Sequence, residues 1–507
     1  MKKINQNKIL SAIVDLLVLF LFTFLIYGSL DIVKLGLYSD DWERHSAYLS
    51  YTRNNPIIDS LSFIEEFPFV LYRAPQLFLF TLSAFINNFL RVGILGFIYV
   101  NFLLNYLIFI VIYYIINHLT KDRPLSLFSV FFIGSIFGRD STFYWGSTQP
   151  VLLSTLLLLV LLLLLTKRND NPVILFFITL ISVWSYEISV IIPFFILFYY
   201  YYEKGKLDKR VFSKVIISAS AVFFVLCFKF YLFPKYVAPS NKASSISEVV
   251  GTSHLKNVFN YPIKTFFDLN PIVNYIKNTD ILNFDNFLIT ITMLVILYLA
   301  LLSSNNSENI LQFNSHNNKK LLYYGLCLFI LSTLVIKIIG FNADIFGKGN
   351  RVLILPVISY GFILINLFYF IKNRSVILIL LIILTSLNIG MLGTIRKVYI
   401  NSWSIQEKVF NNILDSINSR LLVKDNSVIY LYNTNDFLEY GVPVFDEYWT
   451  VTYFMRSATG KSNIEAYFVK NPDRVSLKSQ WTKELIHRDR VVFYDAKNNV
   501  FYKYNNE

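Results

Sequence analysis

Long uncharged stretches constrain this chain more than any other feature. Residues 149–166, for example, are mostly leucine and contain no charged side chain. An apolar helix crosses the ~30 Å hydrocarbon core of a bilayer with about 20 residues. Runs near that length recur along the chain as far as residue 394, and 55% of the residues are hydrophobic whereas only 16% are charged. This pattern excludes a soluble enzyme and predicts an α-helical polytopic membrane protein.

We predict eleven membrane crossings and orient them by the Lys and Arg residues between them. Their residue ranges are 9–30, 92–117, 125–137, 149–166, 172–185, 188–202, 211–233, 287–302, 321–340, 352–371 and 375–394. Lys2, Lys3 and Lys8 precede the first crossing and predict a cytoplasmic N-terminus. The formal charge of +13 then reflects cations in the inner loops, so nucleic-acid binding is the weaker explanation of it. An odd number of crossings puts the C-terminus outside.

Three outer segments, 31–91, 234–286 and 395–507, are too long for simple turns, and function is expected there. In the first, residues 42–50 and 57–69 have the mixed character of interfacial helices, and residues 75–90 predict a helix along the outer leaflet. In the last, residues 427–432 and 491–494 predict strands and residues 406–422 an amphipathic helix. We therefore expect a transmembrane domain over 1–394 and a small outer α/β domain over 395–507.

The strongest candidate site is the acidic pair Asp40 and Asp41, which stands beside Trp42 just after the first crossing. One interpretation is structural: Asp40 caps a short interfacial helix, and Asp41 complements the positive end of that helix. The other is a general base at the outer membrane surface.

Two further outer turns contain ionisable groups among aromatic residues. Arg139, Asp140 and Trp145 lie between the third and fourth crossings, where they form either a sugar-binding site or an ion pair with an interfacial aromatic belt. Tyr186 and Glu187 lie at a hairpin turn, where an acid near membrane depth is costly without a role. The few His and Cys residues have no metal-ligand spacing, so we expect no cofactor and no dedicated metal. Two neighbouring outer acids remain compatible with the binding of a divalent ion.

The chain resembles the GT-C class of integral membrane glycosyltransferases, and most closely the serotype-converting O-antigen glucosyltransferases of bacterial and phage origin. The resemblance rests on the Asp40-Asp41 pair, on Tyr72-Arg73-Ala74-Pro75 ahead of an apolar helix, on Ser185 to Ser189 at an outer turn, on the many short crossings and on the outer C-terminal domain. In the family, the sequence at the place of Tyr72-Arg73-Ala74-Pro75 is closer to Gly-Arg-Pro-Leu. The sequence at the place of Tyr186-Glu187 is closer to Tyr-Gln.

The resemblance implies a reaction in the bacterial inner membrane. Such enzymes take a sugar from a polyprenyl (undecaprenyl) phosphate carrier in the outer leaflet and attach it to a lipid-linked O-antigen acceptor of lipopolysaccharide in the periplasm, with glucose as the expected hexose. It implies Asp40 or Asp41 as the base, Arg351, Arg73 and Lys348 as ligands of the donor phosphate, and Trp42, Arg139, Asp140, Trp145, Tyr186 and Glu187 as contacts of sugar or acceptor. For Arg351 the alternative is an arginine that reaches lipid headgroups.

Rival functions use the same features. A GT-C transferase with another sugar or another acceptor, such as lipid A, a teichoic acid or a protein, has the same pattern. An O-antigen flippase or polymerase-like protein also has many crossings, although polar residues along the bundle centre are expected of it. A membrane scaffold is the third rival, and it gives the paired acids no role.

Overall fold

The computed structural model describes residues 6–42, 72–90, 95–136, 138–233, 284–304, 315–338, 346–368, 371, 373–415, 423–461, 463–470 and 490–503. The interfacial helices predicted at 42–50 and 57–69 lie almost wholly outside these residues, as does most of the outer segment 234–286.

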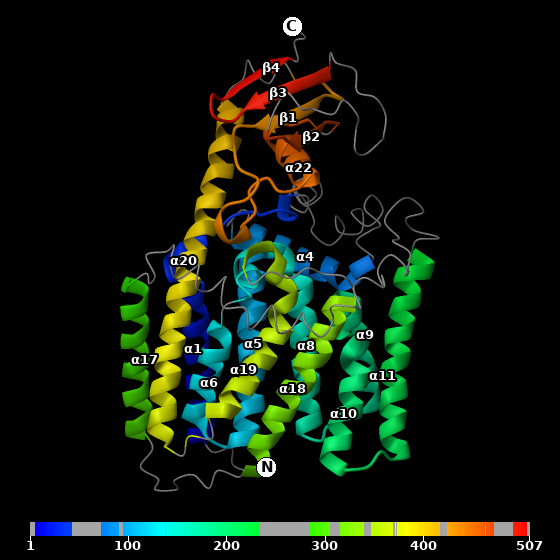
Figure 1. Cartoon of the computed structure of the whole chain (residues 1–507), viewed down its shortest axis with the longest axis vertical. Coiled ribbons are helices and arrows are strands. Elements are labelled where there is room, and N and C mark those ends of the chain that lie inside the picture. The colour runs from blue at the N-terminus through cyan, green and yellow to red at the C-terminus, as the bar shows by residue number, and fades with distance from the viewer. Residues whose placement is uncertain are drawn as a thin grey trace.

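A bundle of upright helices forms most of the described chain, and a small sheet lies beyond one end of it (Figure 1). The bundle contains α1 (Gln6–Ile26), α5 (Gly96–Thr120), α6 (Arg123–Ser135), α8 (Gln149–Thr166), α9 (Pro172–Ser185), α10 (Ile192–Lys204), α11 (Lys209–Cys227), α17 (Phe284–Ser304), α18 (Ser315–Ile338), α19 (Ile354–Phe368) and α20 (Arg374–Asp415). Each predicted crossing overlaps one of these helices. Seven stretches of the described chain are long and apolar enough to cross a membrane. The protein is therefore a multi-pass membrane protein.

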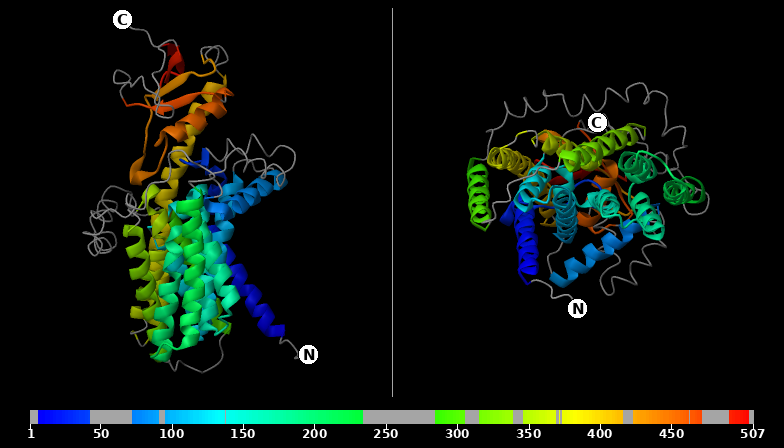
Figure 2. Two further views of the ribbon diagram at one scale, coloured as in Figure 1. Left: turned by 90° about the vertical axis from the view of Figure 1, so that its right-hand side faces the viewer. Right: turned by 90° about the horizontal axis from the view of Figure 1, so that it is seen from below.

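Shorter elements connect the helices. They are η1 (Ser29–Lys34), α7 (Ser141–Tyr144), η4 (Gly146–Thr148), η5 (Glu187–Ile191), the π-helical η6 (Phe228–Leu232) and η7 (Gly347–Leu353). Helix α4 (Ala74–Leu90) lies across the bundle end nearest the sheet instead of running parallel to the other helices (Figures 1 and 2). The helix predicted over residues 75–90 is thus present as α4.

The first crossing ends earlier than its apolar sequence predicts. Gly28 has φ +79°, a left-handed conformation that favours glycine, and the chain turns there after Ile26. The guanidinium of Arg396 lies against this turn: its Nη1 donates to the Ile26 carbonyl at 3.3 Å, and a Cβ on Gly28 would be 2.1 Å from its Cζ. Arg396 also pairs with Asp31 at 3.3 Å. The turn and its arginine therefore fix where the first outer segment begins.

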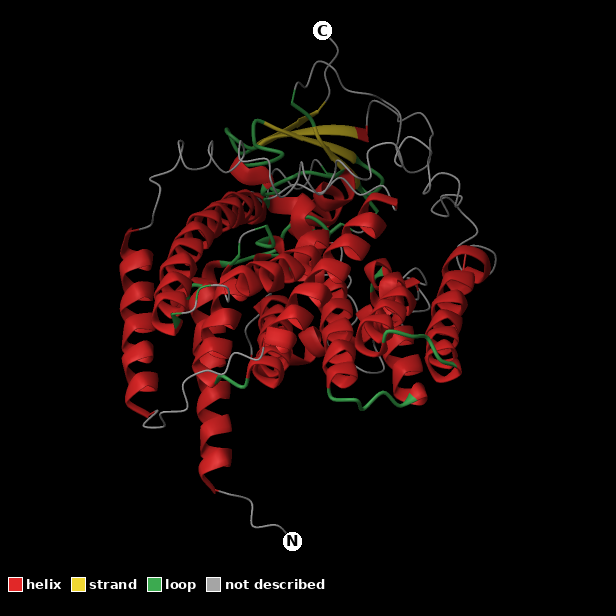
Figure 3. Ribbon diagram, turned by 60° about the horizontal axis from the view of Figure 1, so that its bottom comes forward, coloured by secondary structure: helices red, strands yellow, loops and turns green. Residues whose placement is uncertain are grey.

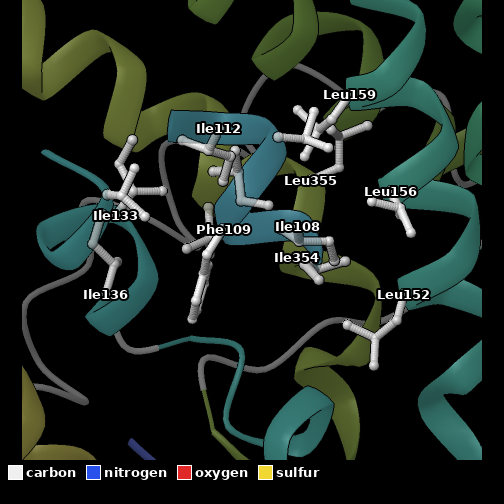
Figure 4. Close-up of a cluster of buried hydrophobic side chains, with 14 of the residues drawn as sticks. Ile108, Phe109, Ile112, Ile133, Ile136, Leu152, Leu156, Leu159, Ile354 and Leu355 are labelled. Atoms are coloured by element: carbon white, nitrogen blue, oxygen red, sulfur yellow. The ribbon is translucent and has the colours of Figure 1, made fainter. Parts of the chain in front are cut away.

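Helix α5 organises the centre of the bundle. It packs against α1, α4, α6 and α8, and its apolar side chains interdigitate with those of α6, α8 and α19 (Figure 4). The labelled core residues are Ile108, Phe109, Ile112, Ile133, Ile136, Leu152, Leu156, Leu159, Ile354 and Leu355. Helix ends that face away from the sheet are joined by ion pairs, such as Asp15 to Arg123 at 2.7 Å and Asp122 to Arg374 at 2.9 Å.

Helix α20 joins the bundle to the C-terminal domain. It is one continuous helix of 42 residues, which at 1.5 Å per residue is about 60 Å long. The sequence predicts a crossing that ends at 394 and a separate amphipathic helix from 406. The structure corrects this division, because the residues between 394 and 406 contain no proline or glycine that would end a helix.

The C-terminal sheet (yellow in Figure 3) has the strand order β2-β1-β3-β4 (Figure 1). Its strands are β1 (Val428–Tyr432), β2 (Glu465–Phe468), β3 (Val491–Asp495) and β4 (Val500–Lys503), with η8 (Glu439–Gly441) between β1 and α22 (Tyr448–Thr459). Strand β1 is parallel to β2 and β3, and β4 is antiparallel to β3. The strands predicted at 427–432 and 491–494 are confirmed as β1 and β3, whereas β2 and β4 were not predicted. Helix α22 packs on one face through a core that includes Ile429, Leu431, Val492 and Phe454, which gives the α/β architecture expected here.

Candidate functional site

The two adjacent acids after the first helix have different surroundings. Ser39 has φ +48° and the Asp41 N–H donates to the Tyr38 carbonyl at 3.0 Å, so the chain turns tightly at the pair. Asp41 is fully buried, and its Oδ2 accepts from the backbone N–H of Tyr38 at 3.2 Å and of Gly146 at 3.1 Å. The Asp41 carboxylate thus fastens the first outer segment to the turn before α8.

Asp40 faces the other way and is accessible. Its side chain is 30% exposed, its Oδ2 lies 3.8 Å from Nη1 of Arg351, and its Oδ1 accepts from Nε1 of Trp449 at 2.9 Å. The Arg351 guanidinium lies over the ring of Trp145, 5.0 Å from its centroid. Three predicted site residues, Asp40, Arg351 and Trp145, therefore meet, although they are far apart in sequence. Trp145 is itself fully buried, so its ring supports Arg351 from below.

The C-terminal domain contributes to the same place. Trp449 comes from the first turn of α22, and the Ser39 hydroxyl donates to Oδ2 of Asp446 at 2.9 Å. The accessible acid and the arginine thus lie at the junction of the helical bundle with the α/β domain.

Asp140, predicted as a sugar or acceptor contact, is fully buried, and both of its carboxylate oxygens accept hydrogen bonds from protein donors. Its Oδ2 accepts from the Gly347 N–H at 3.1 Å and from the Tyr399 hydroxyl at 3.2 Å, and its Oδ1 accepts from Nδ2 of Asn350. Burial raises the pKa of the Asp140 carboxyl to about 7, since its desolvation outweighs the three hydrogen bonds. The structure places this acid beneath the site, where it holds protein segments together.

Arg139 points away from its neighbour Asp140, and no ion pair joins these two described residues. Its Nη2 donates to Oδ1 of Asn105 in α5, and its guanidinium lies over Phe143 at 4.6 Å and Phe109 at 5.6 Å. The side chain is fully buried inside the bundle.

Glu187 forms a second charged cluster, at the start of α4 and η5. It pairs with Lys229 at 2.7 Å and with Arg73 at 3.3 Å. The Arg73 guanidinium lies 4.7 Å from the centroid of the Tyr186 ring, and the Lys229 ammonium lies 4.9 Å from that of Tyr72. Burial raises the pKa of the Glu187 carboxyl, but the two cations outweigh it and lower the pKa to about 2. Arg73, predicted to bind phosphate, thus has a carboxylate partner within the protein.

Two predicted site residues remain. Trp42 is 2% exposed and packs among Trp403, Phe410 and Phe454, and its Nε1 donates to Oε1 of Gln406 at 2.6 Å. Trp42 thus packs between α20 and α22. Because its ring is covered by these side chains, neither face is available to stack on a sugar. Lys348 lies in η7, three residues before Arg351; its side chain is outside what the structure describes.

Sequence reasoning missed the residues that act across long separations. Tyr399, Asn350 and Lys229 each contact a predicted site residue, yet only Asn350 carried a local signal, since it adjoins Arg351. Among the described residues no group of three His, Cys, Asp or Glu side chains is placed to hold a metal ion.

No protein-family model matches the chain, and no curated protein matches its sequence.

Proposed function

We propose that this protein is a membrane glycosyltransferase of the GT-C type that moves a hexose, with glucose expected, from undecaprenyl phosphate to O-antigen. One observation carries the proposal: the accessible carboxylate of Asp40 lies 3.8 Å from the Arg351 guanidinium at the end of a multi-pass helical bundle. An acid beside a cation at that place matches what transfer from a lipid phosphate requires.

Asp40 is the general base in this proposal. It accepts the proton of the acceptor hydroxyl while that oxygen forms a bond to the anomeric carbon of the sugar, and a positioned carboxylate contributes about 10²- to 10⁴-fold. The bond from the anomeric carbon to the phosphate oxygen breaks at the same time, and the bonding electrons leave with the phosphate. Because the acceptor attacks opposite the leaving group, the anomeric configuration inverts.

Arg351 holds the departing phosphate in this proposal. Its forked N–H donors match phosphate oxygens and offset the negative charge that develops on them. The Trp145 ring beneath the guanidinium keeps it at the level of Asp40. Lys348, in the same short helix, adds a second cation to the segment.

The topology proposed with this function keeps eleven crossings, a cytoplasmic N-terminus and a periplasmic C-terminus in the bacterial inner membrane. The α/β domain then lies on the periplasmic side with the acceptor, and the donor reaches Arg351 from the outer leaflet.

The test is transfer of radiolabelled glucose from synthetic undecaprenyl phosphate glucose to O-antigen in membranes. We expect Asp40→Asn to lower the rate about 10²- to 10⁴-fold. Asp41→Asn keeps an acceptor oxygen for its two backbone donors and should lose much less. Asp31→Asn is the matched control, since the Asp31 side chain is also 30% exposed in the same outer segment.

Arg351→Ala should raise the KM for the donor more than the KM for the acceptor. A full rate in Asp40→Asn would remove the base assignment. Absence of transfer by the unmodified protein with any polyprenyl phosphate sugar would favour a flippase or polymerase-like role instead.

A further inference from the structure

Asp140 joins three segments that are remote in the chain. Its carboxylate accepts from Gly347 and Asn350 of the segment that carries Arg351, and from Tyr399 in α20. Gly347 and Asn350 stand on either side of Lys348, and Asn350 immediately precedes Arg351. The hydrogen bonds therefore fix both ends of the short stretch that leads into the arginine.

The same stretch is held from its other sides. Oδ1 of Asn350 accepts from the backbone N–H of Ser141 at 3.2 Å and from its hydroxyl. Gly347 has φ +70°, and a Cβ there would lie 2.2 Å from the Tyr440 carbonyl oxygen. Gly347 is therefore confined between Asp140 and η8.

Tyr399 extends the connection to the acidic pair. Its backbone carbonyl accepts from the Tyr38 hydroxyl at 2.9 Å, and the two rings meet edge to face at 5.1 Å. The Tyr38 hydroxyl also accepts from the Gly36 N–H at 3.2 Å. Tyr38 precedes Asp40 by two residues, so one tyrosine of α20 contacts both Asp140 and the turn that presents the base.

We propose that Asp140 is a positioning residue that sets the separation of Arg351 from Asp40 through Gly347, Asn350 and Tyr399. The inference rests on the proposed transferase function and assigns Asp140 no contact with substrate, in keeping with its complete burial. Both oxygens of the Asp140 carboxyl group accept hydrogen bonds, and three N–H or O–H donors converge on them. Asparagine has one acceptor oxygen, and its NH₂ group would face at least one of these donors, so Asp140→Asn must open the connection.

A double-mutant cycle on donor kinetics tests this role. Displacing a reacting group by about 1 Å can cost on the order of 10²-fold in rate, so we expect Asp140→Asn to raise the donor KM and lower kcat by up to that factor together. If Asp140 acts through Arg351, then Arg351→Ala should raise the donor KM much less in the Asp140→Asn background than in the unmodified protein. Tyr399→Phe, which removes one hydroxyl, should give a smaller change of the same kind.

Hydrogen exchange provides a readout that does not depend on activity. In Asp140→Asn and in Tyr399→Phe, the peptide over residues 346–353 should exchange at least tenfold faster than in the unmodified protein. The control is Asp122→Asn, which alters an acid whose side chain is 9% exposed and paired with Arg374 at the far end of the bundle. It should change neither the exchange of 346–353 nor the donor kinetics.

The outcomes separate the two proposals. Faster exchange with a non-additive cycle supports the positioning role. Unchanged exchange, or faster exchange with fully additive kinetic effects, overturns it. If the unmodified protein transfers no sugar, the transferase proposal fails, and unchanged exchange would then refute the structural connection on its own.

Discussion

Replacing Glu187 by glutamine should destabilise the fold, because it leaves a buried ammonium without its carboxylate. The Lys229 side chain is 0% exposed and the Glu187 side chain 11% exposed, so water screens this pair weakly. The pKa of the Glu187 carboxyl falls from 4.5 to about 2, and at 1.36 kcal/mol per unit this corresponds to about 3 kcal/mol. Breaking a buried ion pair by removing one partner typically costs about 3–5 kcal/mol. The pKa shift and this typical cost therefore predict a similar loss in the free energy of unfolding.

The sign of the pH dependence follows from the direction of the Glu187 shift. The carboxyl has a lower pKa in the folded state than in the unfolded chain, so its ionised form stabilises the fold at pH values above about 4.5. That stabilisation is lost as the pH falls from 4.5 towards 2. The difference between the unmodified protein and Glu187→Gln should therefore be largest near neutral pH and shrink on acidification.

Thermal unfolding in detergent micelles, followed by tryptophan fluorescence at several pH values, measures the stability difference between the unmodified protein and Glu187→Gln. Asp208→Asn is the control, because the Lys204 and Asp208 side chains are 40% and 39% exposed and exposed ion pairs contribute little to stability. Adding Lys229→Met to Glu187→Gln should recover part of the lost stability, since it removes the buried ammonium while Arg73 still lacks its carboxylate partner. A Glu187→Gln variant as stable as the parent at pH 7, or equally destabilised at every pH, would refute the reasoning.

Two further substitutions test packing and capping. Gly146→Ala places a Cβ 2.8 Å from the Phe97 Cβ and 3.2 Å from Oδ1 of Asp41; overpacking of this kind costs about 1–3 kcal/mol, and unfolding midpoints should fall accordingly. Asp122 is the N-cap of α6 and accepts from the Leu125 N–H at 3.0 Å. The Asp122→Ala variant should therefore be about 1 kcal/mol less stable than Asp122→Asn, which keeps the cap. Equal unfolding midpoints for the two variants would contradict this expectation.

The helices of this protein could be predicted because their information is local. An uncharged run near bilayer length specifies a helix almost regardless of its partners, and every predicted crossing overlaps one. The ends are less predictable: α1 stops at Ile26 because of Gly28 and Arg396, which are 368 residues apart in the sequence and meet only in the fold. Strands β2 and β4 were missed because each has only four residues, too few for an alternating pattern to be distinctive.

In the candidate site, too, local features could be predicted from the sequence, whereas contacts between distant residues could not. Adjacent acids are visible in the sequence, but which of Asp40 and Asp41 is accessible depends on a tight turn and on Gly146, which lies more than 100 residues further on. Arg351 carries a local signal, because Gly347 and Gly349 precede it just before an apolar helix. For Trp449 the sequence favours a core position, because such aromatic residues are usually core. Contacts across 409 residues leave no mark in a single sequence.

The unbroken helix α20 has a consequence for exchanging C-terminal domains between related proteins. Because the helix turns 100° and rises 1.5 Å with each residue, inserting one residue in its middle would swing the whole α/β domain a quarter-turn or more about the helix axis. Trp449 would then leave Asp40, even though no residue of either domain had changed. A hybrid would have to keep the helical phase across the splice point, so recombination of such domains is restricted to crossovers that preserve the residue count along α20.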